Sequence, residues 1–365
     1  MTGRERTLTA LEGKPVDRTP VAGGLLQNPE LLARIAGEHD FWEAPRRILF
    51  EGFRRLGCDA ILGPVMPKRP EEVTLDADGN PTDFSRHDVE TVITTPEAMA
   101  EHARNAPTPA EVRDSFSYQD AYDEYVSCSR DCQEECPDML LIPHCLGYAP
   151  WFPTSDGHFS YESFLMACAL YTEDMKPLFE SWGEAARIRF EAVAAAIVDH
   201  DLPRIVWTGQ DICDARAPVL SPALLEQLYF PQVARAIEPL KAAGMQVVWH
   251  ADANYIQIID RLIELGLDGF QGFYETDDGI QLHELAKKTN LNGDPLILFG
   301  SVATAWVLPN GSTDDVRADV RRCLDVAAGR GRFILAPSSS IGPEVPEENV
   351  LAMYEEACGT PDDQP

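Results

Sequence analysis

The feature that most constrains the fold of this chain is a regular alternation of short apolar runs with longer amphipathic segments. The runs are rich in β-branched and aromatic residues, which is typical of buried strands, and the segments between them have helical spacing. Strands that alternate with helices usually form a parallel sheet covered by helices. The eight runs are Thr19–Leu25, Ala60–Val65, Met139–Pro143, Arg204–Thr208, Gln246–Trp249, Leu267–Phe273, Leu296–Phe299 and Phe333–Ala336.

Eight strands in alternation with helices predict an α/β fold of the (β/α)₈ TIM barrel type. The alternative is an open, doubly wound sheet. We expect a single domain over residues 1–360, with residues 361–365 as a tail. Residues 67–138 interrupt the alternation and contain a hairpin turn signal at 76–80, so they are predicted to be an insertion after strand two that covers one end of the barrel.

Several helices are marked by their boundary residues. Thr2 and Glu5 have the spacing of a capping box for a short first helix that ends near Gly13. Later helices are expected where an N-cap or an amphipathic pattern begins and a glycine closes the segment, at 221–244, 255–266 and 314–329.

The charge balance is strongly acidic, with 60 acidic against 30 basic residues and a formal net charge of −30. Such a surface repels nucleic acid and anionic membranes, so neither is expected as a partner. The N-terminus lacks the apolar segment of a secretory signal, and no run approaches the about 18 apolar residues of a membrane span. Nine cysteines, an odd number, indicate reduced thiols. The prediction is a cytoplasmic protein.

The carboxyl ends of the strands are where the active site of such a fold is expected. His250 and Asp252 follow the fifth strand, Asp211 the fourth and Glu275 the sixth, and these four are the predicted catalytic residues. Histidine with carboxylates serves general acid–base chemistry or holds zinc, and both readings stay open. The metal ligands would be His250, Asp211 and Glu275, whereas Asp252 equally fits an N-cap. Predicted substrate-binding residues at these ends are Gln27, His144, Gln210, Tyr274, Ser338 and Ser339.

Three cysteines recur at a spacing of four, Cys128, Cys132 and Cys136. On a helix they would lie along one face. Both gaps hold three residues, which fits neither the radical-SAM spacing nor the short gaps of typical zinc sites. The favoured interpretation is a helix that packs its thiols inward, and a metal site is the alternative.

A family resemblance runs along most of the chain. It is carried by Arg4-Glu-Arg-Thr-Leu-Thr-Ala-Leu-Glu-Gly13 with Asp17-Arg18-Thr-Pro-Val21, by Val247-Val-Trp-His250-Ala-Asp252, by Gly300-Ser-Val302, and by Ile334-Leu-Ala-Pro-Ser338 with the segment 343–349. With these motifs the chain resembles the uroporphyrinogen decarboxylase and corrinoid-dependent methyltransferase superfamily. The resemblance independently implies a TIM barrel, and it implies a homodimer.

The departures from the family patterns decide between its activities. Uroporphyrinogen decarboxylases carry an Arg-Gln-Ala-Gly-Arg run after strand one, where this chain has Gly23-Gly-Leu-Leu-Gln-Asn-Pro29 without arginine. Asp59 lies near the family's catalytic aspartate and is a further candidate for substrate binding. The methyltransferases hold zinc with His-x-Cys, a later Cys and often a Glu. Here His250 and Glu275 match, Asp252 replaces the first Cys, and serines at 338–340 replace the second.

The resemblance therefore predicts methyl transfer from a small O- or N-methyl substrate to a corrinoid protein or a thiol. The corrinoid would be carried by a separate partner, and zinc is the implied metal. Asp211, Glu226 and His250 are candidates by analogy with the O-demethylase branch. One alternative is a decarboxylase of a tetrapyrrole or a smaller carboxylate, in which Asp59 or Asp211 would stabilise positive charge. A non-catalytic ligand-binding barrel is the third hypothesis.

Overall fold

Each of the eight predicted apolar runs overlaps one strand. The computed structural model describes residues 1–67, 69, 91–143, 145, 147–155, 157–275 and 279–359. The strands are β1 (Ala22–Gly23), β2 (Ala60–Leu62), β3 (Leu140–Ile142), β4 (Ile205–Gly209), β5 (Gln246–Ala253), β6 (Gly269–Phe273), β7 (Ile297–Phe299) and β8 (Phe333–Ile334). The predicted strand positions are thus confirmed, and β5 continues four residues beyond its predicted end.

The strands form two parallel sheets, in the orders β1-β2-β3 and β4-β5-β6-β7-β8. A parallel bridge between Val21 and Leu335 connects the β1 and β8 edges. The remaining edge strands are β3 and β4. Between them, the backbone N–H of Cys145, just after β3, donates to the carbonyl oxygen of Trp207 in β4 over 3.1 Å. An α/β fold with parallel strands is therefore confirmed. Two sheets, rather than one closed ladder, are what the described residues form, so the closed barrel stays a prediction.

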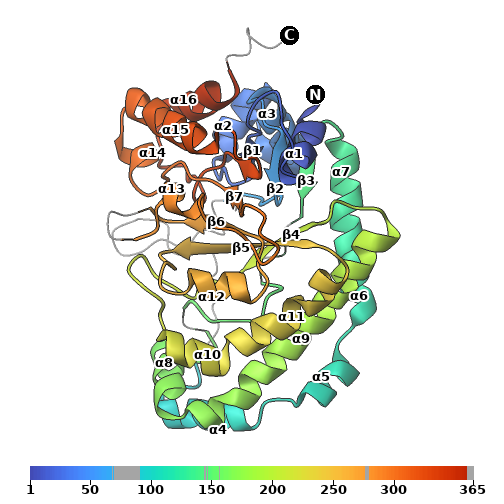
Figure 1. Ribbon diagram of the computed structural model, residues 1–365, viewed down its shortest axis with the longest axis vertical. Helices are drawn as coiled ribbons and strands as arrows, with labels where there is room; N and C mark the ends of the chain where they lie inside the picture. Colours follow the sequence, from blue (N-terminus) through green and yellow to red (C-terminus); the bar gives the residue numbers. More distant parts are fainter. Residues whose placement is uncertain are drawn as a thin grey trace.

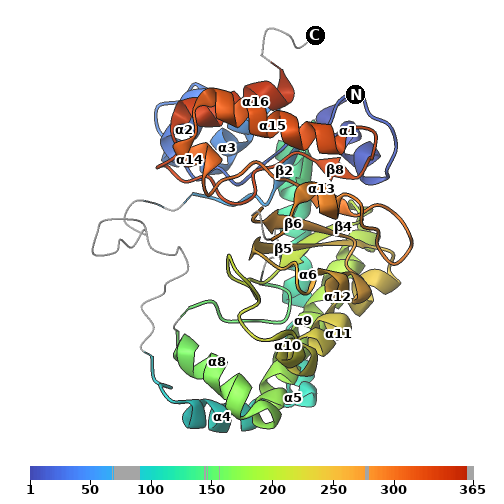
Figure 2. The same ribbon diagram turned by 60° about the vertical axis from the view of Figure 1, so that its left-hand side comes forward.

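Helices cover the strands on both sides (Figure 1). On the side of the N-terminus lie α1 (Gly3–Leu11), α2 (Pro29–Ala36), α3 (Pro45–Arg55), α15 (Thr313–Ala327) and α16 (Glu347–Cys358). On the other side lie α9 (Thr172–Asp199), α10 (Pro222–Leu228), α11 (Phe230–Ala242) and α12 (Ile259–Glu264), as the turned view in Figure 2 also shows. Further helices are η1 (Phe41–Glu43), α4 (Pro96–Arg104), α5 (Pro109–Ser115), α6 (Tyr118–Val126), α7 (Cys132–Glu135), α8 (Tyr161–Leu170), α13 (Leu282–Leu285) and α14 (Val307–Asn310).

The helix boundary signals are largely confirmed. Thr2 and Glu5 form both hydrogen bonds of a capping box at the start of α1. The predicted helix over 221–244 is instead two helices, α10 and α11, which meet at Tyr229. Pro231 explains the interruption, because proline lacks an N–H and disfavours helical geometry in the residue before it.

The described part of the predicted insertion is helical. Helices α4, α5 and α6 pack against α9, which in turn packs against α11. Glu184 of α9 is fully buried and accepts hydrogen bonds from Arg113 of α5, from Arg187 and from Arg235 of α11. The turn at 76–80 lies outside the described residues, and an insertion that covers one end of the barrel stays a prediction. Among the helices described, none is both long and apolar enough to cross a membrane.

The core consists of two sets of buried side chains. The larger set lies between strands and helices. The smaller set brings together apolar side chains from every strand except β6, among them Leu62, Ile142, Trp207, Ile297 and Ile334. Burial of a Leu or Ile side chain stabilises the folded state by about 1.5–3 kcal/mol. The smaller set is the pattern that the interior of a barrel would produce.

Candidate active site

His250 lies on β5, between two strands that hold it in register. It is paired with Gly209 of β4 and with Gln271 of β6. The indole ring of Trp207 meets the imidazole edge-on, with ring centroids 5.6 Å apart. Gly272 has a φ of +90°, and a Cβ there would lie 2.6 Å from Nδ1 of His250. Glycine is therefore required beside the imidazole, and the ring is closely packed on this side.

Gln271 fixes the protonation pattern of the imidazole. The Gln271 amide nitrogen donates to the backbone carbonyls of Ser338, at 3.2 Å, and Pro337, at 3.5 Å. Its Oε1 therefore faces Nδ1 of His250, 2.5 Å away. An amide oxygen only accepts hydrogen bonds, so Nδ1 carries a proton and the neutral ring has its lone pair on Nε2.

Asp252 lies two residues further on, where the pairing of β5 with β6 is interrupted by a bulge between His250 and Ala253. Its Oδ2 accepts a hydrogen bond from the Ser339 hydroxyl, and its backbone N–H donates to Oδ1 of Asp211 over 2.9 Å. Oδ1 of Asp252 is buried and has no hydrogen-bond partner in the described part of the chain. It lies 3.7 Å from Nε2 of His250.

The pKa of Asp252 is raised, chiefly because burial disfavours the charged carboxylate, against the opposing effects of His250 and the Ser339 hydroxyl. A carboxyl group of raised pKa beside the free nitrogen of a histidine is an arrangement that can hold and transfer one proton. Proton transfer is therefore the chemistry that this part of the site is equipped to perform.

The remaining predicted residues of the strand ends differ in their positions. Burial is the main cause that raises the pKa of Tyr274 to about 12, against the effect of the nearby Ser339 hydroxyl. Gln27 donates from its amide nitrogen to the carbonyl of Val65, over 3.2 Å. Gln210 directly follows β4 and is partly exposed. His144 lies outside the described residues.

Two predicted residues are bonded to groups outside the His250 cluster. Arg322 donates two hydrogen bonds to the carboxylate of Glu275, which also accepts from the Ser301 hydroxyl and the backbone N–H of Leu282. The hydroxyl of Ser338 is within 2.9 Å of the Thr304 hydroxyl. Both side chains are thus engaged by neighbouring residues, and a role for them in catalysis or substrate binding stays a prediction.

The predicted zinc ligands do not fit a zinc ion as a set. Within the ranges that the structure describes, no three His, Cys, Asp or Glu side chains are grouped so as to hold a metal. The Glu275 carboxylate is bound by the guanidinium of Arg322, with which a metal would have to compete. Asp211 accepts the backbone N–H of Asp252. Glu226, the candidate by analogy, forms an ion pair with Arg261 on the surface.

Asp59 lies away from this cluster, because it precedes β2 and so stands at the amino ends of the strands. Its carboxylate accepts hydrogen bonds from Arg6, from Arg18 and from the backbone N–H of Val21. The guanidinium of Arg6 also donates hydrogen bonds to both carboxylate oxygens of Asp17. The structure therefore does not bring Asp59 together with His250.

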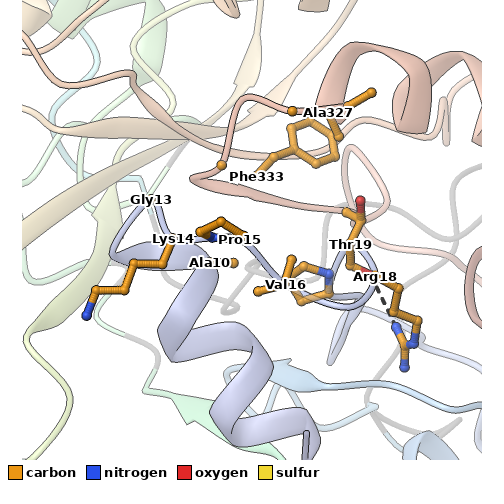
Figure 3. A pocket seen from close by; sticks show the side chains of 13 residues that line it. Ala10, Gly13, Lys14, Pro15, Val16, Arg18, Thr19, Ala327 and Phe333 are labelled. Atoms are coloured by element: carbon orange, nitrogen blue, oxygen red, sulfur yellow. Dashed lines mark hydrogen bonds between the residues drawn. The ribbon is translucent and has the colours of Figure 1, made fainter.

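A pocket of about 370 Å³ opens near Arg18, also at the amino ends of the strands (Figure 3). Its walls come from the end of α1, the segment 14–20 and the loop before β8. The guanidinium of Arg18 is bonded to Asp59 and to the carbonyl of Thr19. Because ligands of parallel α/β folds bind at the carboxyl ends of the strands, we place the candidate active site at His250 and not here.

The sequence reasoning missed Gln271 and Arg322. Gln271 had a signal, since it is a polar residue between Phe270 and Gly272 in the predicted strand Leu267–Phe273, and it is fully buried. A buried polar side chain within a strand must find a partner. Arg322 had none, because it lies on α15, 47 residues from Glu275 in the chain.

Fold and site together define a class: a parallel α/β protein with titratable side chains gathered at the carboxyl ends of neighbouring strands. A family model described as uroporphyrinogen decarboxylase (URO-D) matches residues 209–358, a range that includes His250, Asp252, Gln271 and Ser339. Two sequences from Methanosarcina barkeri, both named methylcobamide:CoM methyltransferase MtaA, are each 25% identical over 384 aligned positions, and the match covers 96% of both chains.

A solved structure, a methyltransferase from Methanosarcina mazei, has the same fold, with a TM-score of 0.64 and 19% sequence identity. The match covers 98% of each chain. The predicted resemblance to the uroporphyrinogen decarboxylase and corrinoid-dependent methyltransferase superfamily is therefore confirmed, by the family model over residues 209–358 and by the similarity to methyltransferases along nearly the whole chain.

Proposed function

We propose that this protein is a methyltransferase that moves a methyl group from a small O- or N-methyl substrate to a corrinoid protein or a thiol. The similarity to methylcobamide:CoM methyltransferases along nearly the whole chain supports methyl transfer. The observation that carries the site is the 3.7 Å approach of His250 Nε2 to Oδ1 of Asp252, a buried atom that has no hydrogen-bond partner among the described residues.

Loss of a methyl group leaves an electron pair on the donor oxygen or nitrogen, and that atom must then take up a proton. His250 is proposed to supply it from Nε2, as a general acid. Asp252 stabilises the protonated imidazole, and Gln271 holds the ring in the orientation that directs Nε2 outward. Where the acceptor is a thiol, the neutral ring takes the thiol proton at the same nitrogen. The methyl acceptor supplies the electron pair of the new bond.

Other residues of the cluster support this pair. The Ser339 hydroxyl holds Oδ2 of Asp252, and Tyr274 lies near that serine. Asp211 fixes the backbone of Asp252. Gln27, Gln210 and His144 are proposed to contact substrate at the surrounding strand ends. Because the predicted zinc ligands do not fit as a set, no step is assigned to zinc.

The corrinoid is proposed to arrive on a separate protein and to act as a substrate.

We further propose that the eight strands close into one TIM barrel over residues 1–360. The Val21–Leu335 bridge, the hydrogen bond between Cys145 and Trp207, and the shared interior cluster support closure. In such a barrel the His250 cluster would lie at the mouth, open to a docking partner.

The test is methyl transfer by the purified protein in two assays. One offers methylcobalamin and a mercaptoalkanesulfonate thiol, and the other offers reduced cobalamin with O- and N-methyl donors. The absorbance change of the corrinoid reports transfer in both. His250→Asn is expected to lower the rate by about 10²–10⁴-fold, the usual contribution of a general acid or base. His283→Asn, at an exposed position on α13, is the matched control.

Equal rates for wild type and His250→Asn would contradict the proposed role of His250. If neither assay shows transfer and the protein instead releases CO₂ from a carboxylate substrate, the decarboxylase alternative replaces the proposal. The match to the uroporphyrinogen decarboxylase family model favours that alternative. Against it stands Asp59, one of its two charge-stabilising candidates, which is bound by Arg6 and Arg18.

A further inference from the structure

Two consecutive serines after β8 contact both halves of the proposed proton-transfer pair. The carbonyl oxygen of Ser338 accepts a hydrogen bond from the amide nitrogen of Gln271 at 3.2 Å, and Oε1 of the same amide faces Nδ1 of His250. The Ser339 hydroxyl donates to Oδ2 of Asp252. The segment 338–339 therefore orients the imidazole through Gln271 and the carboxylate directly.

Thr304, in the loop after β7, anchors the first of these serines. Its backbone N–H donates to the hydroxyl oxygen of Ser338 over 3.2 Å, and its own hydroxyl lies 2.9 Å from that oxygen. Ser338 is 3% exposed, and its backbone N–H donates to the carbonyl of Val302 over 2.9 Å. The backbone and the side chain of Ser338 are therefore all hydrogen-bonded within the protein, and the residue is held in one conformation.

Helix α15 and strand β8 fix the anchor itself. The backbone N–H of Ala303, the residue before Thr304, donates to Oδ2 of Asp319 on α15 over 2.9 Å, and the Asp319 side chain is only 11% exposed. Beyond the ends of β7 and β8, a parallel bridge joins Val302 to Pro337. Thr304 therefore stands on a segment that rigid elements hold, as precise positioning of a functional group requires.

The orientation of the Gln271 amide depends on this arrangement. If the amide turned over, its oxygen and nitrogen would exchange places. The oxygen would then face the carbonyls of Ser338 and Pro337, so that acceptors would meet acceptors. The nitrogen would donate to Nδ1 of His250, and the neutral ring would carry its proton on Nε2. A Ser338 carbonyl that is fixed in place therefore disfavours that tautomer.

We propose that Thr304 is a positioning residue for the His250–Asp252 pair and that it acts through Ser338. The proposal rests on the proposed function of His250, and it gives Ser338 a positioning role where the sequence predicted substrate binding. Without the Thr304 hydroxyl, Ser338 is free to turn and the Gln271 amide loses its single orientation. Part of the protein then carries the imidazole proton on Nε2, and such a ring cannot accept a proton there.

The tautomer of His250 can be measured without an enzymatic assay. Protein with ¹⁵N in its histidine rings is examined by NMR at a pH at which the ring is neutral, and the His250 signals are assigned by their loss in His250→Asn. In the wild type, Nδ1 is expected to carry the proton. Thr304→Val keeps the shape of the side chain but lacks the hydroxyl, so both nitrogen signals should shift toward those of a mixture of tautomers. Thr304→Ser should keep the wild-type signals.

Ser338→Ala removes the same hydrogen bond from its other partner. It is expected to shift the His250 signals in the same direction as Thr304→Val. The double variant should add little further change, because the two residues belong to one network.

Methyl transfer provides the second readout. Thr304→Val is expected to lower kcat by about 2–10-fold, the effect of one hydrogen bond of ordinary strength. KM should change little, because Thr304 acts through Ser338 and not on the substrate, and Thr304→Ser should restore the rate. Thr172→Val is the matched control, since this partly buried threonine also donates its hydroxyl, to the carbonyl of Cys168 over 2.8 Å.

His250 signals in Thr304→Val that match those of the wild type would overturn the proposal, and so would an equal shift in Thr172→Val. If the signals shift while kcat stays unchanged, the positioning role is supported and the proposed role of His250 in methyl transfer is contradicted. The NMR measurement therefore separates failure of this inference from failure of the proposed function.

Discussion

Two carboxylates stand at opposite ends of the strands and have opposite surroundings. Asp59, at the amino ends, has both oxygens bonded, to Arg6, Arg18 and a backbone N–H. Asp252, at the carboxyl ends, has one oxygen bonded to Ser339 and the other buried without a partner in the described residues. Asp59 is buried and Asp252 is partly exposed, and only Asp252 retains an acceptor that a substrate or a proton can use.

This difference in hydrogen bonding indicates how to distinguish carboxylates that stabilise the fold from carboxylates that take part in function. A buried carboxylate whose bonds are all formed contributes to stability, whereas an unsatisfied buried polar atom costs free energy and calls for a functional reason. The motif Asp17-Arg18, which helped to reveal the family, belongs to the first group, because both residues are part of the network around Arg6 and Asp59. The three predictions that follow test this contrast.

The largest effect is expected at the amino ends. Asp59→Ala leaves two arginines without their buried partner, and the free energy of unfolding should fall by about 3–5 kcal/mol. Denaturant unfolding measures this, and Asp17→Ala, at a half-exposed partner of Arg6, should cost about 1 kcal/mol or less. The specific activity of the folded fraction should not change. If Asp59→Ala lowers the free energy of unfolding by less than about 1 kcal/mol, the structural role of Asp59 is contradicted.

An intermediate effect is expected at Gln271. Gln271→Met removes the acceptor at Nδ1 of His250, so the ring no longer has a fixed tautomer. We expect kcat to fall by about 10–100-fold with little change in KM, as for other residues that orient a functional histidine. The pH profile should shift, which a merely structural loss would not produce, and Gln271→Glu should partly restore the rate. An unchanged pH profile for Gln271→Met would speak against a positioning role.

The smallest effect is expected from Asp252→Asn on stability. The raised pKa means that the folded state binds this proton more tightly than the unfolded state. Stability is therefore fully present below the ordinary aspartate pKa and is lost as pH rises toward the raised value. The variant should be more stable than wild type at neutral pH, by about 1 kcal/mol, and the gain should vanish in acid. Thermal melts across this range measure it, and a pH-independent difference would contradict the assignment.

The sequence predicted the strands better than the contacts of individual side chains. All eight strands were located, because burial between helices leaves a continuous apolar run. His250, Asp252, Asp211 and Ser339 were expected at the strand ends, and the structure joins them by short contacts. Whether a carboxylate at the end of a strand is already bound by an arginine depends on residues that are far away in the chain. Arg322 engages Glu275 from 47 residues away, and Arg18 engages Asp59 from 41. No local pattern reports such pairings.

Glu184 has a consequence for how the molecule opens. It connects α5, α9 and α11 through three arginines, and α11 packs on β5, the strand of His250. These helices should therefore not separate from the strands in partial unfolding events. Their backbone amides should exchange with solvent deuterium at rates close to those of β5, so that the outer helical layer and the strand of the candidate site form one cooperative unit.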